Sequence, residues 1–310
     1  MTTAAQPTAA QTTAPPTISA PQLVAQLAGP TPPVVLDASY LLEHPEFDGD
    51  YRSTDAREGF ERAHVPGALY VDVARQFSDP RGSTHYTHPS PQAVVDELAR
   101  LGIGEGAPVV VYDTTQTIFA ARLWYLLRWV GVDARVLDGG LAAWTTAGQD
   151  VETGPTAPPA AVAPWSARET RAAWVTRTEL VARATADERP LVCGLPAGSF
   201  AGTAVSRYSR RGRIPGSVNV SARALFAPDG TMLPAAEIAE AYHAAGVDGA
   251  EEVLLYCGGG ISASANALTL AAIGIDSVRI YDGSLEEWST DESLPLETDA
   301  ETPGTAHAER

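Results

Sequence analysis

Short apolar runs alternate with longer amphipathic segments along most of the chain. The runs at 34–38 and 108–113 are continuous in Val and Leu, a composition typical of strands that are buried on both faces. The segments at 89–103 and 119–131 carry apolar residues at helical spacing and are predicted to be helices. A further apolar run at 134–140 returns the chain to a strand. This alternation predicts an α/β fold in which a mostly parallel sheet is flanked by helices.

The same pattern occurs twice. The stretch PVVVYDTTQTIFAARLWYLLRWVGVDARVLDGGLAAW in the first half corresponds to EVLLYCGGGISASANALTLAAIGIDSVRIYDGSLEEW in the second. Asp138 aligns with Asp282 and Trp144 with Trp288, in both cases at an offset of 144 positions (282 − 138 and 288 − 144). A repeat of this length predicts a tandem duplication of one domain.

Segments rich in Pro and Ala divide the chain. We expect residues 1–17 and 299–310 to be disordered tails, because they are biased in composition and lack an apolar period. Residues 152–167 have the composition of a linker. An N-terminal domain at 18–151 and a C-terminal domain at 168–298 remain, each of ordinary domain size.

Composition excludes several classes of function. The formal net charge of −17 argues against nucleic acid and anionic membranes as partners. No apolar run is long enough to span a membrane, and the first basic residue is Arg52, so we expect a cytoplasmic protein. Cys193 and Cys257 are too few for a disulfide framework, and the histidines are scattered. We therefore expect no metal site and no cofactor.

One of the two cysteines has a setting that indicates chemistry. Cys257 follows an apolar run and precedes three glycines and a predicted helix, whereas its equivalent in the first repeat is Asp113. Glycines let amide N–H groups turn inward, and these amides together with the positive end of the helix favour a thiolate. We expect Ser262 to be the N-cap of that helix. The expected amide cradle consists of Gly258, Gly259, Gly260, Ile261 and Ser262. The alternative is a small buried cysteine beside a flexible turn.

These motifs resemble the two-domain rhodanese family, the thiosulfate and 3-mercaptopyruvate sulfurtransferases. The residues that carry the resemblance run from Val34 to Trp288 and read VVLDAS, DAREGFERAHVPGA, VVVYD, VLDGGLAAW, RIPGSVNV, YCGGGIS and IYDGSLEEW. The resemblance implies two tandem rhodanese-like domains, of which the N-terminal one is an inactive copy. It also implies that Cys257 takes a sulfane sulfur from an anionic donor as a persulfide. A thiol, cyanide or a thioredoxin-like acceptor then removes that sulfur.

The sequence departs from the family at positions that bind the donor. The loop is closer to the mercaptopyruvate-type CGSGVT, but the serine of that motif is Gly259 here, and the family's partners of that serine fall near Ala74 and Tyr86. The family's anion-binding arginine falls at Leu195. We expect other basic residues to replace it. The substrate-binding candidates are Arg207, Arg210, Arg211 and His85.

Other functions fit the sequence less well. A cysteine phosphatase needs a Cys-x5-Arg loop, and the corresponding position is Ala263, so the group that stabilises the transferred phosphate is missing. A persulfide carrier or sensor without turnover, or a binding module with the rhodanese fold, remains an alternative. Cys193 is expected at the end of a strand beside Cys257, either as a resolving thiol or as a small buried residue.

Overall fold

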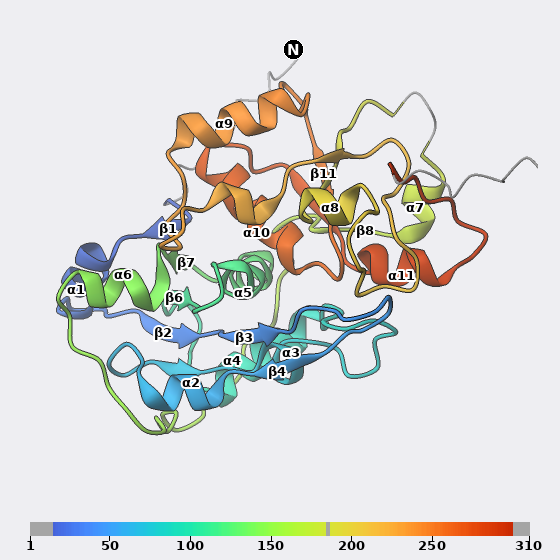
Figure 1. The fold of residues 1–310 in the computed structure, drawn as a ribbon. Helices are drawn as coiled ribbons and strands as arrows, with labels where there is room; N and C mark the ends of the chain where they lie inside the picture. The colour runs from blue at the N-terminus through green and yellow to red at the C-terminus, as the bar shows by residue number, and fades with distance from the viewer. Residues whose placement is uncertain (1–14, 184–186, 300–310) are drawn as a thin grey trace, which may run out of the picture.

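The computed structural model describes residues 15–183 and 187–299, which form two α/β domains (Figure 1). The expected tails lie mostly outside these residues, although Thr17 already belongs to the first strand and Asp299 pairs with Arg213 at 2.8 Å. No helix in the described part of the chain is both long and apolar enough to cross a membrane.

The N-terminal domain is built on a five-stranded sheet in which every pairing is parallel. Its strand order is β1-β7-β6-β2-β5, and Leu36 lies opposite Val111 in the register. The apolar runs predicted a mostly parallel sheet but not this order. An antiparallel hairpin, β3 and β4, stands apart from the sheet. The strands are β1 (Thr17–Ile18), β2 (Val34–Asp37), β3 (Tyr40–Leu42), β4 (Ser53–Asp55), β5 (Leu69–Tyr70), β6 (Val109–Tyr112) and β7 (Ala134–Leu137). The helices are α1 (Ala20–Leu27), α2 (Arg57–Arg62), α3 (Val73–Gln76), α4 (Pro91–Arg100), α5 (Ile118–Trp129) and α6 (Gly140–Thr146).

The C-terminal domain repeats this topology. Its parallel sheet has the order β8-β12-β11-β9-β10, which matches the first sheet strand for strand. The strands are β8 (Trp174–Val175), β9 (Leu191–Cys193), β10 (Val218–Asn219), β11 (Val253–Tyr256) and β12 (Val278–Tyr281). The helices are α7 (Arg177–Val181), α8 (Ala197–Phe200), the 3-10 helix η1 (Ala222–Leu225), α9 (Ala235–Ala244), α10 (Ile261–Ala272) and α11 (Ser284–Thr290).

The two copies differ in length at one loop. The strands β6 and β11 begin 144 positions apart (253 − 109), whereas α5 and α10 begin only 143 positions apart (261 − 118). The loop that follows Cys257 is therefore one residue shorter than the loop that follows Asp113. The chain regains this residue between α10 and β12.

The domains meet across α5 and α10, which pack together in the middle of the molecule (Figure 1). One apolar cluster includes buried side chains of both domains, such as Trp124 and Leu268. Equivalent loops also cross the interface in both directions. The backbone N–H of His88 donates to Asp282 at 2.6 Å, and that of Met232 donates to Asp138 at 2.7 Å. The donors of these two hydrogen bonds are 144 positions apart (232 − 88), and so are the acceptors (282 − 138). The two domains are therefore related by approximate twofold symmetry.

Candidate active site

Cys257 lies directly after β11, at the carboxyl edge of the sheet, where loops in parallel sheets form binding crevices. Its side chain is 2% exposed and borders a cleft of about 310 Å³. Its backbone N–H donates to the Ser284 hydroxyl at 3.1 Å. The N-terminal domain forms one wall of this cleft, so the cleft lies between the domains. The residues that it contributes are Leu42, His44, Pro45 and Tyr51.

The glycines after Cys257 are required by close contacts. A Cβ on Gly258 would fall 1.3 Å from the Tyr208 hydroxyl oxygen. Gly260 has a φ of +77° and caps α10, which begins at Ile261. The expectation that Ser262 is the N-cap is therefore wrong. The loop is one residue shorter than in the first repeat, so the helix begins earlier and Ser262 lies in its first turn.

The N-terminal copy shows what this loop geometry can hold. The carboxylate of Asp113 fills the equivalent loop and accepts backbone hydrogen bonds of 2.8 to 2.9 Å from four amides. Two of these amides belong to the second and third residues of α5. The four donors are Thr115, Thr117, Phe119 and Ala120. The loop is thus an anion cradle made of backbone N–H groups and a helix N-terminus.

The corresponding amides of α10 belong to Ser262 and Ala263. They precede the first bond of the helix, which Ser264 donates to the Gly260 carbonyl at 3.2 Å, so they have no acceptor within the helix. Sequence reasoning included Ser262 but missed Ala263. The one-residue difference between the loops, which shifts the alignment of the helices, was the signal that could have identified it.

The arginine candidates have different surroundings. Arg207 lines the cleft. Arg210 lies outside the cleft lining, and its guanidinium donates to backbone carbonyls at and after the end of α11, including Ser289 at 2.8 Å. Arg211 also lies outside the lining and pairs with Asp48 of the N-terminal domain at 2.9 Å. Only one of the three predicted arginines, Arg207, therefore lines the cleft that Cys257 borders.

Arg223 also lines the cleft, although sequence reasoning did not single it out. It lies in η1, a short helix just after β10. No motif marks it, because its position depends on how the chain turns after that strand. The only available signal was an arginine placed soon after the RIPGSVNV motif.

His85 joins the two domains beside the active-site loop. Its ring Nδ1 lies 2.5 Å from Glu286, and its backbone N–H donates to the same carboxylate at 3.1 Å. The ring stacks on Tyr51 with centroids 4.0 Å apart. A Cβ on Gly259 would lie 3.3 Å from Glu286, so this pair covers the loop. Burial raises the pKa of Glu286, while the hydrogen bond with His85 opposes that shift.

A buried ion pair supports the loop from behind. Arg122 of α5 is fully buried and lies 2.7 Å from Asp282, which follows β12. A second nitrogen of Arg122 donates to the Tyr86 carbonyl at 2.7 Å. A Cβ on Gly260 would come within 2.6 Å of Asp282 and 2.8 Å of Arg122. The loop after Cys257 thus packs against an ion pair to which the N-terminal domain contributes Arg122 and the C-terminal domain contributes Asp282.

Hydroxyl groups and a second thiol complete the surroundings. Burial raises the pKa of both Tyr51 and Tyr208 well above the ordinary value, so these side chains are neutral donors at pH 7. Burial also raises the pKa of Cys193 to about 12. Cys193 pairs in register with Tyr256, and successive strand residues face opposite ways, so Cys193 points away from the side of the sheet that Cys257 occupies. This arrangement favours the interpretation of Cys193 as a small buried residue.

Comparison with known proteins agrees with this geometry. Residues 21–147 and 203–291 match the rhodanese-like domain family. The chain is 31% identical over 282 residues to SseB of Mycobacterium tuberculosis. That alignment covers 90% of this chain and 95% of SseB. It is 30% identical over 257 residues to the thiosulfate sulfurtransferase of Gallus gallus. That alignment covers 82% of this chain and 85% of the relative. SseA of Escherichia coli, a 3-mercaptopyruvate sulfotransferase of rhodanese fold, superposes with a TM-score of 0.74 and 24% identity, over 87% of this chain and 99% of SseA.

The chain therefore belongs to the rhodanese family, and it consists of two rhodanese-like domains in tandem. More narrowly, relatives that align over most of its length are named as sulfurtransferases, and the protein is a sulfurtransferase enzyme. The sequence motifs predicted both the family and this class of activity.

Proposed function

We propose that this enzyme moves a sulfane sulfur from a small anionic donor to a thiophilic acceptor through a persulfide on Cys257. The observation that carries the proposal is that Cys257 and Asp113 occupy equivalent positions in the two copies of the domain. The first copy holds a fixed anion in a cradle of amides, and the second copy has a sulfur nucleophile at the same place, open to a cleft. Thiosulfate and 3-mercaptopyruvate, on which relatives act, are donors of the required kind.

In the first half-reaction the Cys257 thiolate attacks the outer sulfur of the donor. A bond forms between Sγ and that sulfur while the donor's own bond to it breaks, and the electron pair leaves with the remainder of the donor. In the second half-reaction a thiol, cyanide or a thioredoxin-like protein attacks the outer sulfur of the persulfide, and the Cys257 thiolate is restored. Such a double displacement gives ping-pong kinetics.

The backbone amides of the loop stabilise the charge on sulfur in this proposal. The first-turn amides of Ser262 and Ala263 lie where Phe119 and Ala120 bind a carboxylate in the other copy. A persulfide ion also carries one negative charge, so the same donors serve it. Preorganised N–H groups in a site with little water stabilise such charge without reorganising during the reaction.

The mass of the intact protein tests the proposal. Wild type and Cys257→Ser are incubated separately with thiosulfate and with 3-mercaptopyruvate, and Cys193→Ser is the matched thiol control. We expect wild type and Cys193→Ser to gain the mass of one sulfur atom and to lose it on addition of cyanide, whereas Cys257→Ser gains nothing. A gain that persists in Cys257→Ser would contradict the proposal. Persulfide formation without multiple turnovers would indicate a carrier or sensor.

A further inference from the structure

The cleft at Cys257 differs in charge from the rest of the molecule. The whole chain has a formal net charge of −17, yet no Asp or Glu is among the described residues that line the cleft. Two arginines line it, Arg207 and Arg223. The lining of this cleft thus carries two arginines and no carboxylate in an acidic protein, and the nearest carboxylate on the loop side, Glu286, is paired with His85.

Neither arginine has an ion-pair partner among residues 15–183 and 187–299, whereas other arginines of the same segment do. Arg211 pairs with Asp48 at 2.9 Å and Arg213 pairs with Asp299 at 2.8 Å. A nitrogen of the Arg207 guanidinium, Nη1, is shielded from solvent and has no acceptor in the described part of the chain. A shielded N–H group without an acceptor is costly, and an anionic ligand in the cleft would satisfy it.

The two guanidinium groups influence each other although they come from separate segments. Arg207 precedes β10, and Arg223 lies after it in η1. The pKa of Arg223 is lowered by partial removal from water and then by the positive charge of Arg207, while the charge of Asp113 opposes this shift. A ligand with a single charge would neutralise half of this pair. A ligand with two negative charges would neutralise both.

We infer that Arg207 and Arg223 together form a subsite for a doubly charged sulfur oxyanion, so that the donor is of the thiosulfate class and not a keto acid with one carboxylate. This inference rests on the proposed sulfur transfer. When the thiolate takes the outer sulfur of thiosulfate, sulfite leaves with the electron pair and with both negative charges, and it needs no proton. The same two arginines therefore hold the donor's charged end before the step and the leaving group after it.

Binding to an inactive variant tests the subsite without any turnover. Sulfite and thiosulfate are titrated by calorimetry into Cys257→Ser and into the same protein carrying Arg207→Gln, Arg223→Gln or Arg223→Lys. We expect each glutamine variant to bind about 10- to 100-fold more weakly, because a hydrogen bond to a charged group contributes about 1.5–3 kcal/mol. Arg223→Lys keeps the charge and should recover part of the affinity. Arg62→Gln, an exposed arginine on α2 outside the cleft, is the matched control and should bind as the parent does.

Steady-state kinetics then tests the choice of donor. In Arg223→Gln, kcat/KM for thiosulfate should fall by about 10- to 100-fold, mainly through KM, while kcat/KM for 3-mercaptopyruvate falls by no more than about threefold. Equal losses for the two donors, or no loss with thiosulfate, would overturn the inference. The two proposals can fail separately. If Cys257→Ser binds sulfite through both arginines but wild type forms no persulfide, sulfur transfer fails and the subsite stands. If Arg223→Gln forms the persulfide from thiosulfate as wild type does, the subsite fails.

Discussion

Asp113 and Cys257 occupy equivalent places in the two copies, and in the proposed mechanism this difference decides which copy reacts. A carboxylate that accepts four amide hydrogen bonds is held permanently and has no free pair directed at a substrate. In the proposed mechanism a sulfur at that place uses the amides of its own loop and acts as the nucleophile. The scaffold therefore supplies the same cradle twice, and a single residue makes one of the two copies a candidate for chemistry.

Gly260 offers a test of the loop at the scale of one residue. We expect Gly260→Ala to lower the free energy of unfolding by about 2–5 kcal/mol, because the left-handed backbone costs about 1–2 kcal/mol and overpacking typically about 1–3 kcal/mol. The added Cβ would press on Asp282 and Arg122, so persulfide formation should slow as well. Urea unfolding and the rate of mass gain with thiosulfate measure the two effects.

Gly274 is the matched control at the other end of α10. It also has a positive φ, of +86°, but a Cβ there would meet nothing within 4 Å. Gly274→Ala should therefore show only the cost of backbone strain and leave persulfide formation unchanged. Equal losses of stability and rate in the two variants would mean that contact with the buried ion pair does not matter.

Sequence reasoning reached Cys257, its loop and Arg207, but not the buried ion pair behind the loop, for a physical reason. A nucleophile after a buried strand and before a glycine loop is a local pattern, so one stretch of sequence contains all of it. Arg122 is also locally unusual, since it lies within a predicted helix that is otherwise mostly apolar. Its partner Asp282 lies in the other domain, and no spacing along the chain reveals that contact.

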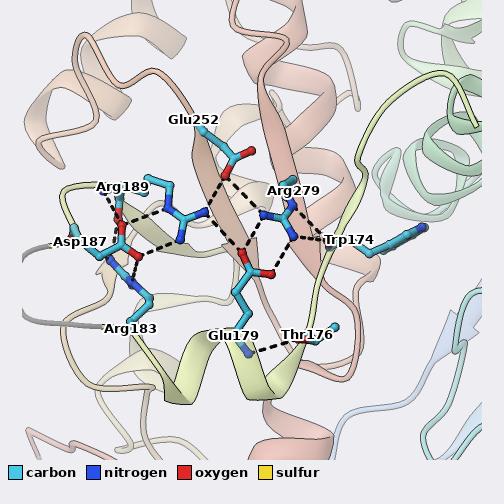
Figure 2. Close-up of polar contacts among 8 residues, drawn as sticks. All are labelled: Trp174, Thr176, Glu179, Arg183, Asp187, Arg189, Glu252 and Arg279. Atoms are coloured by element: carbon cyan, nitrogen blue, oxygen red, sulfur yellow. Dashed lines mark hydrogen bonds and ion pairs between the residues drawn. The ribbon is translucent and has the colours of Figure 1, made fainter.

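At the scale of elements, an ion-pair network fastens α7 to the C-terminal sheet (Figure 2). Glu179 of α7 accepts hydrogen bonds from Arg279 of β12 at 2.7 and 2.8 Å. Arg189, just before β9, joins Asp187 to Glu252 at distances of 2.9 and 2.8 Å. The network lies near the amino ends of the strands, away from Cys257, so its role is structural.

This network predicts a pH dependence of stability. Hydrogen bonding to Arg279 lowers the pKa of Glu179, so the pair stabilises the protein above the unfolded pKa of about 4.3, and that stability is lost as the pH falls through the folded pKa. Glu179→Gln should thus have a lower Tm than wild type at pH 7, and the difference should shrink below about pH 4. The exposed pair of Glu58 with Arg62 provides the control, since Glu58→Gln should change Tm little at any pH. A difference for Glu179→Gln that did not vary with pH would contradict this account.

The long elements were predictable and the short ones were not. The strands β2, β6 and β7 and the helices α4 and α5 lie where the apolar pattern predicted them. The start of α10 was misjudged because a serine is a good N-cap by side chain, whereas this helix is capped by a glycine backbone in the left-handed region. The 3-10 helix η1 is four residues long, too short for any period to show, and Arg223 was missed with it.

At the scale of the whole molecule, the domains share one core. Buried side chains of both sheets and of α5 and α10 belong to a single apolar cluster, among them Leu36, Trp124, Leu255 and Leu268. Separating the domains would expose that surface to water and would break the Arg122–Asp282 pair, which joins one domain to the other.

We therefore expect the two domains to unfold together. Thermal unfolding followed by calorimetry, tryptophan fluorescence and circular dichroism should give one transition, with coincident midpoints and equal calorimetric and van't Hoff enthalpies. Two separated transitions would show that the interface is too weak to couple the domains.

The duplication predicted the strand order of the second sheet from the first, but not how the two sheets meet. That arrangement depends on pairs such as His88 with Asp282, whose partners lie in different domains. Each of the two residues is ordinary in its own segment. The cleft, its charge and its N-terminal wall emerge only when such pairs are brought together.

The presence of Asp113 where the second copy has Cys257 also affects how the protein meets oxidants. A reactive thiolate can be driven through sulfenic to sulfinic acid, and the later steps are irreversible, whereas a carboxylate is inert to this chemistry. Only two cysteines are present in the chain, and Cys193 is fully buried with its pKa raised to about 12. Oxidative damage at sulfur nucleophiles is thereby confined to Cys257. In the proposed mechanism the persulfide places an outer sulfur where an oxidant meets it first, so turnover would itself shield the Cys257 thiol.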